Sequence, residues 1–130
     1  MVDAVSAVRR GRVAAAALFT DACVIERESG SVMDPVTFEE RPSWVPVYAG
    51  ACRVKVLSSA PVEGAGRTYV ITDALLQLPV GDVRFLDNDR VTITAAAYDD
   101  DLEGVVLTVT SREVRTHATM RRLHVSEVTG

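Results

Sequence analysis

Cysteine and histidine are scarce in this 130-residue sequence, which contains two residues of each type. Cys23 and Cys52 lie far apart, and neither belongs to a CxxC pair or has the histidine spacing of a zinc site. The pattern favours two reduced cysteines that serve as small apolar residues, and it leaves a disulfide between them open. We therefore expect no metal site and no cofactor.

Catalytic and nucleotide-binding motifs are also missing. His117 and His124 are the only imidazoles and lie in no nucleophile motif, and the GxSxG, GxGxxG and P-loop patterns do not occur. A Ser-His-Asp arrangement is defined in space, so the sequence leaves it open. Aromatic residues make up 5% of the chain, which disfavours a stacking platform for single-stranded nucleic acid. These absences indicate a protein that is not an enzyme.

No stretch of the chain approaches the roughly 20 apolar residues of a membrane span. Arg9, Arg10 and Arg12 precede "VAAAALF" in the manner of a signal peptide, but that run is short and Asp3 comes before the arginines. Lys55 is the only lysine, and the net charge is -4. We expect a protein that is neither secreted nor membrane-embedded and that does not wrap a polyanion with its whole surface.

Period-two alternation of β-branched residues dominates what is present, and it follows one alanine-rich stretch of helical spacing. The pattern predicts a single domain over residues 1–130, with an N-terminal α-helix at about 3–19 and a β-barrel at about 22–128. The fold class is mainly β: a small antiparallel β-barrel or sandwich of about six strands. The expected strands cover 23–28, 45–57, 67–79, 89–98, 104–116 and 119–128.

Three polar segments separate these strands. "SGS" (29–31) is predicted to be a turn, and Ser58 to Arg67 is predicted to be a long irregular loop. "DDDLEG" (99–104) holds four acids, but their spacing does not fit a calcium-binding EF-hand loop. We interpret it as a solvated turn between two strands, with Gly104 in a conformation that glycine permits.

The order of elements, more than any one motif, carries a family resemblance. The informative parts are "Y-x-G-x-C-R-V" (Tyr48 to Val54), "LDNDRVTI" (86–93) and "D-x-L-x-G-x-x-L-x-V", which ends at Val109. Over nearly its whole length the chain resembles the head-to-tail stopper (head-completion) proteins of long-tailed bacteriophages, particularly those of phages of actinobacteria.

That resemblance implies a structural protein of the virion neck, without enzymatic activity. Such a protein assembles with itself into a ring, perhaps a hexamer or dodecamer, below the portal and adaptor proteins. The ring retains packaged double-stranded DNA in its channel and offers a docking surface to the tail terminator or tail tube. The alternatives are a tail-completion or tail-terminator ring protein, and a cellular barrel-type binding module.

Two groups of residues are candidates for these contacts. In the helix, Arg9 and Arg12 are predicted to meet acids of the adaptor or of the next subunit, while Val5, Val8 and Phe19 pack on the barrel. Solvent-exposed arginines without a partner are the alternative. The predicted channel-facing loop, for which a plain surface loop is the alternative, contributes Ser58, Pro61, Glu63, Gly64, Gly66 and Arg67.

Overall fold

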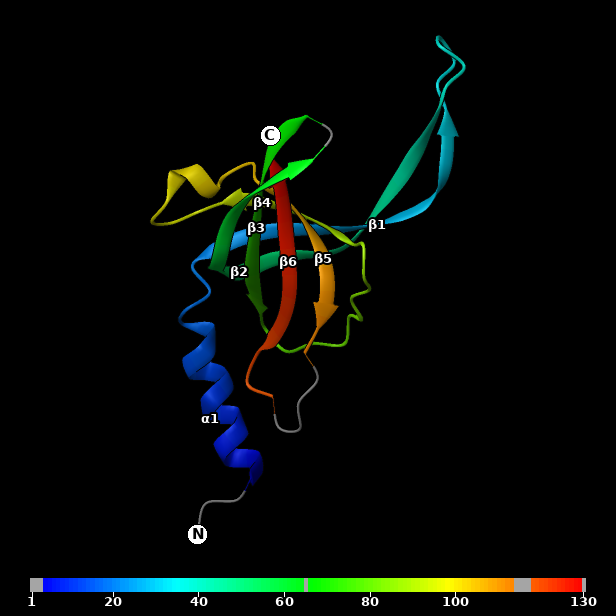
Figure 1. The fold of residues 1–130 in the computed structure, drawn as a ribbon. Coiled ribbons are helices and arrows are strands. Elements are labelled where there is room, and N and C mark those ends of the chain that lie inside the picture. The colour runs from blue at the N-terminus through cyan, green and yellow to red at the C-terminus, as the bar shows by residue number, and fades with distance from the viewer. Residues whose placement is uncertain (1–3, 65, 114–117, 130) are drawn as a thin grey trace.

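Six antiparallel strands close into a barrel in the computed structural model, which describes residues 4–64, 66–113 and 118–129 (Figure 1). The strand order around the ring is β1-β2-β3-β6-β5-β4, and one helix precedes it. The predicted fold class is confirmed. The elements are α1 (Ala4–Ala16), β1 (Asp21–Met33), β2 (Glu40–Gly64), β3 (Arg67–Leu78), β4 (Arg90–Ala95), the 3-10 turn η1 (Asp100–Leu102), β5 (Val106–Arg112) and β6 (Arg121–Thr129).

Closure depends on the length of β2, which pairs with two strands in succession. Its first half, up to Cys52, is antiparallel to β1, and the part from Arg53 onward is antiparallel to β3. The ring then closes where β1 pairs with β4, for example Ile25 opposite Val91. A closed ring satisfies the strand hydrogen bonds that an open sheet would leave at its edges.

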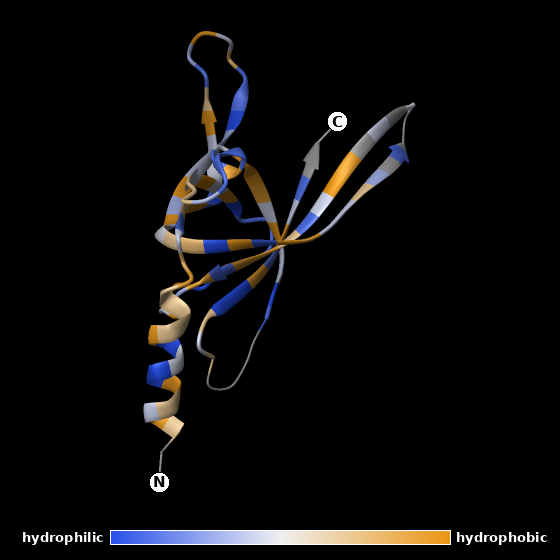
Figure 2. Ribbon diagram, turned by 90° about the vertical axis from the view of Figure 1, so that its left-hand side faces the viewer, coloured by the Kyte–Doolittle hydropathy of each residue, from blue (hydrophilic) through white to orange (hydrophobic). Residues whose placement is uncertain are grey.

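The core lies inside this ring and is built by the period-two alternation of the strands (Figure 2). Cys23 and Cys52 belong to it as buried free cysteines, in the role that the sequence predicts. A hydrogen bond to Cys52, together with burial, raises the pKa of the Cys23 thiol, so this sulfur stays protonated. The largest side chains that are fully buried are Ile25, Leu76, Leu78, Val91, Ile93, Val109 and Val125.

The prediction of a turn at 29–31 is wrong, because β1 continues through this segment to Met33. The register of β1 against β2 shifts between Glu28 and Ser31, and Gly30 has a φ of 69°. Glycine at positive φ is typical of a β-bulge as well as of a turn, so the residue types alone do not separate the two. The chain reverses later, after Met33, in the segment 34–39.

The prediction of an irregular loop at Ser58 to Arg67 is also wrong. Residues 58–64 continue β2 and pair with 67–73 of β3, from Ser58 opposite Asp73 to Gly64 opposite Arg67. Small and polar residues are tolerated here because the hairpin extends beyond the core and needs no apolar face. This part of β2 has β3 as its only described partner and is therefore an edge strand. Proline, which lacks an N–H group, is tolerated in edge strands, so Pro61 fits this position.

The acidic turn forms where the sequence predicts it, between β4 and β5. Asp99 caps η1 by accepting a hydrogen bond from the Asp101 N–H at 3.1 Å, and Gly104 has a φ of 84°.

The longer connection from β3 to β4, residues 79–89, is fastened to the barrel by two arginines. Arg121 donates to the carbonyls of Val83 and Gly81. Arg27 donates to the Arg84 carbonyl at 2.8 Å. These bonds hold the connection against β6 and β1, the strands from which the two arginines come.

Candidate functional site and interaction surfaces

Three elements that project from the barrel carry many of its exposed apolar and charged side chains (Figure 1). The β1–β2 hairpin reaches away from one end, and the β2–β3 hairpin rises at that same end. Helix α1 extends from the opposite end. The two groups of predicted contact residues are therefore not brought together, because Arg9 and Arg12 lie at the far end of the molecule from the β2–β3 hairpin.

The projecting part of the β1–β2 hairpin, residues 28–41, is the feature that the sequence did not predict; we call it the arm. Beyond Glu28 its strands pair only with each other, and all of its residues except Asp34 are exposed. Four apolar side chains of the arm are 56% to 83% exposed. They are Val32, Met33, Val36 and Phe38. Large exposed apolar side chains gathered on one projection are typical of an interaction surface.

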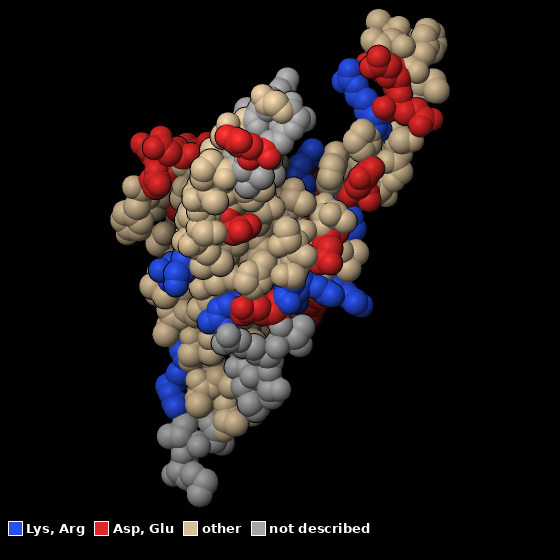
Figure 3. Space-filling view, viewed as in Figure 1, with Lys and Arg blue, Asp and Glu red and all other residues tan. Residues whose placement is uncertain are grey.

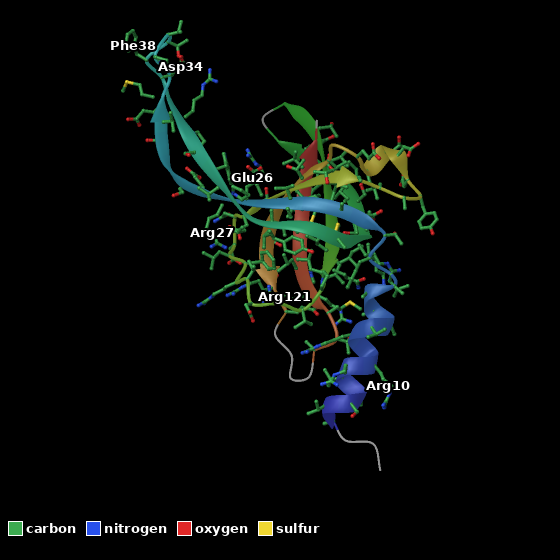
Figure 4. The ribbon with its side chains drawn as sticks, turned by 180° about the vertical axis from the view of Figure 1, so that it is seen from behind. Arg10, Glu26, Arg27, Asp34, Phe38 and Arg121 are labelled. Atoms are coloured by element: carbon green, nitrogen blue, oxygen red, sulfur yellow. The ribbon has the colours of Figure 1, made fainter. Side chains whose placement is uncertain are left out.

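The tip of the arm is an ordered turn (Figure 4). The Asp34 carboxylate accepts hydrogen bonds from the N–H groups of Val36 and Thr37 at 2.8 and 3.3 Å, and this lowers its pKa. The Phe38 N–H donates to the Asp34 carbonyl at 2.9 Å, which holds Phe38 at a φ of 58°. Positive φ is rare for a bulky residue. The turn thus displays a 74% exposed phenylalanine ring at the end of the molecule.

The base of the arm is braced against the barrel. Arg27 binds the buried Asp89 carboxylate through two hydrogen bonds of 3.1 and 2.9 Å. Arg90 pairs with Glu26 at 3.1 Å and stacks over the Trp44 ring at 4.0 Å. These contacts fix the direction in which the arm leaves the barrel.

Helix α1 touches the body of the protein along a narrow line. Gly11 faces Thr119 so closely that an added Cβ would lie 2.6 Å from its methyl group. Arg12 donates to the Ala118 carbonyl at 3.2 Å. Phe19, which follows the helix, is buried, whereas Val8 is half-buried and Val5 is 67% exposed. The helix packs against none of the described strands, so the predicted packing of Val5 and Val8 on the barrel is not seen there.

The helix also carries positive charge and a hollow. Arg9, Arg10 and Arg12 are exposed, and residues 4–16 contain no acid. A shallow depression of about 270 Å3 is lined by Val5, Val8, Arg9 and Arg12. Arg10 is exposed on the same helix and does not line it. The predicted contact residues Arg9 and Arg12 therefore form the rim of one apolar hollow.

The β2–β3 hairpin presents the other predicted residues as strand and turn. Ser58, Pro61 and Glu63 are exposed, and Gly66 occupies the turn with a φ of 75°. The Ser58 hydroxyl lies 3.4 Å from the Asp73 carboxylate across the hairpin. Gly64 and Arg67 are opposite each other at its end. The hairpin is a projection of paired strands that carries both polar and apolar residues, in place of the expected loop.

A larger pocket of about 480 Å3 lies at the helix end of the barrel, beside Arg121 (Figure 4). Arg84, Arg112 and Arg122 also line it, together with the acids Asp82 and Glu113. Arg121 lies over the Phe85 ring at 5.2 Å, and burial lowers the pKa of its guanidinium. Its bonds to the 79–89 connection give this arginine a structural role.

His124 is the one histidine among the described residues. His124 Nε2 lies 3.3 Å from a Glu113 carboxylate oxygen, and His117 falls outside the described residues. Within residues 4–64, 66–113 and 118–129, no group of three or more His, Cys, Asp or Glu side chains is placed to hold a metal ion. Over that same part of the chain, no helix is long and apolar enough to cross a membrane.

The arm carries net negative charge and helix α1 carries net positive charge (Figure 3). The arm holds four acids and one arginine, whereas α1 holds three arginines and no acid. Arg41 pairs with Asp34 at 3.5 Å, so the surplus negative charge of the arm lies on Glu28, Glu39 and Glu40. The fold and these surfaces define a small β-barrel protein with exposed projections of different charge.

A family model matches residues 11–126, which is most of the chain. The protein belongs to this family, DUF6093, a family of unknown function. The match covers the barrel and the last part of α1, so the fold described above is that of the matched region. No curated protein and no solved structure matches the chain.

Proposed function

We propose that this protein is a structural component of the phage neck that forms a ring below the portal and adaptor proteins. The ring closes the DNA-filled head and provides the docking surface for the tail. The proposal rests on the resemblance to head-to-tail stopper proteins, carried by Tyr48 to Val54, the 86–93 segment and the motif ending at Val109.

One structural observation supports a role in assembly, because the barrel is closed and yet its three projections are extended and exposed. Each strand of the closed ring has two partner strands, so we expect subunits to meet through the projections and through side-chain faces. The helix packs against none of the described strands, which leaves its outward surface available to a neighbouring molecule.

The β2–β3 hairpin is the element that we propose to face the channel. It is narrow, its exposed tip carries Glu63, and the whole chain has a net charge of -4. Negative walls repel the DNA phosphates, so DNA can slide through the channel without being trapped. Retention of DNA then depends on the width left between the hairpins of the ring.

The decisive experiment is negative-stain electron microscopy of particles made with the gene for this protein inactivated, beside particles complemented with the intact gene. Head closure predicts tailless heads that have lost their DNA, together with free tails of normal length. Filled heads with tails of irregular length would instead assign the protein to the tail end. Normal infectious particles would reject both roles.

A further inference from the structure

We propose that the arm of one copy docks onto helix α1 of a second copy, with Phe38 inserted into the hollow lined by Val5, Val8, Arg9 and Arg12. This inference rests on the proposed ring-forming function and names the contact between its subunits. The occupant of the helix surface is thus a second molecule of the same chain.

Both surfaces offer exposed apolar side chains. The arm ends in one exposed aromatic ring, and the helix offers one shallow hollow with two valines and two arginines. An aromatic ring buried against valines gains hydrophobic contact, and an arginine beside its face adds a cation-π interaction. Val13, which is 71% exposed on the same helix, extends the apolar surface.

The charges are complementary as well. Glu39 and Glu40 directly follow Phe38 and are exposed, while Arg9 and Arg12 form the rim of the hollow. Docking Phe38 therefore brings acids of the arm toward arginines of the helix. Opposite charges at the rim of an interface accelerate association and select the partner.

Geometry requires that this contact be between molecules. The arm and α1 leave the barrel at opposite ends, so the arm of a chain does not reach its own helix (Figure 1). The braces at Arg27 and Arg90 hold the base of the arm in place. A contact between two different surfaces is heterologous, and repeated copies of it form a ring when the rotation closes.

The test is sedimentation velocity over a concentration series, with one variant on each surface. Phe38→Asn removes the ring and keeps a residue that tolerates positive φ, and Arg9→Glu places an acid in front of Glu39 and Glu40. We expect wild-type protein to self-associate and each variant to lose about tenfold or more in affinity. Phe38→Asn removes the apolar anchor, and Arg9→Glu brings like charges together at the interface.

The matched controls are Tyr98→Asn and Arg10→Glu. Tyr98 is an 88% exposed aromatic residue near the β4–β5 turn, and Arg10 lies on the same helix outside the hollow. Both controls should associate like wild type. Unchanged thermal melting of all four variants by circular dichroism ensures that lost association does not reflect lost folding.

Mixing the two variants tests the direction of the contact. The Phe38→Asn chain retains an intact helix, and the Arg9→Glu chain retains an intact arm, so the mixture should form dimers and nothing larger. A wild-type protein that stays monomeric at every concentration overturns the proposal. Normal self-association of either variant overturns it too, and so does a mixture of the two variants that stays monomeric.

The outcome is separable from that of the proposed function. If the purified protein stays monomeric and heads made without it lose their DNA, the arm contact is rejected and head closure stands. If the protein self-associates through the arm and particles made without it are normal, head closure is rejected and the arm contact stands.

Discussion

Asp89 holds the 79–89 connection and the base of the arm together, and its removal is the most direct test of how the barrel is fastened. Its carboxylate is 3% exposed. It accepts two hydrogen bonds from Arg27, at 3.1 and 2.9 Å, and one from the Leu86 N–H, at 2.9 Å. The Arg27 bond also raises the pKa of that guanidinium, which keeps it charged.

The Asp89→Ala substitution deprives both donors of their acceptor. A hydrogen bond to a charged group contributes about 1.5–3 kcal/mol, and a buried N–H left without a partner costs about 1–3 kcal/mol. The Arg27 side chain is 32% exposed, so water can solvate it again and the lower ends of both ranges apply. We expect a loss of about 3 kcal/mol in the free energy of unfolding. For a chain of this size that lowers Tm by about 10 °C.

The assay is thermal and chemical denaturation followed by circular dichroism, with Asp87→Ala as the control. Asp87 is an exposed acid two residues away, so this change removes the same charge and should alter the free energy of unfolding by less than about 0.5 kcal/mol. Asp89→Asn keeps the shape and one acceptor oxygen, so its loss should be intermediate. Equal melting of Asp89→Ala and wild type would refute this reasoning, because Arg27 would then be satisfied by its other bond, to the Arg84 carbonyl.

Three further predictions concern the core, the arm and the hairpin. Ile25→Ala empties a fully buried position and should cost about 2–5 kcal/mol in chemical denaturation, with Ile25→Val near 1 kcal/mol; equal costs would place Ile25 outside the core. The pKa of Asp34, followed by NMR titration, should lie below its ordinary value because of the Val36 and Thr37 N–H groups. The stability that the ionised Asp34 contributes is therefore present at pH values above its unfolded-state pKa and is lost as the pH falls through its lower folded-state pKa. A folded-state pKa equal to the ordinary value would mean that these bonds do not hold the tip. Deletion of residues 61–66 should leave Tm nearly unchanged, because this part of β2 pairs with β3 alone, and should let DNA leak from filled heads; full retention would reject the channel role.

The core and the fold class follow from local pattern. Val91 and Ile93 alternate with polar residues, as do Leu107 and Val109, and these positions are the ones that the barrel buries. The acidic turn before Gly104 was predictable for the same reason, since turn chemistry is local. The sequence also singled out Arg9 and Arg12 as candidate contact residues, which stays a prediction, but it did not show the hollow that they line.

The projecting hairpins could not be predicted in this way. The arm is exposed on both faces except at Asp34, and residues 58–61, 63 and 66 of the second hairpin are exposed, so burial imposes no alternation of apolar and polar residues there. Without that signal, Gly30 favoured a turn, and the small residues around Pro61 favoured a loop. Phe38 was missed because an isolated aromatic residue in a polar stretch does not show whether it is buried or displayed.

By itself the sequence determined that the protein is a β-rich domain with one N-terminal helix, because side-chain alternation and helix propensity act over a few neighbouring residues. Only the tertiary structure decided that β1 closes onto β4, that Arg27 meets Asp89 across 62 positions, and that the arm and α1 leave opposite ends of the barrel. These features depend on strand register and on pairing between segments that are distant in the sequence. The folding free energy that favours them comes from burying side chains of several such segments together, and a short stretch of sequence does not show this.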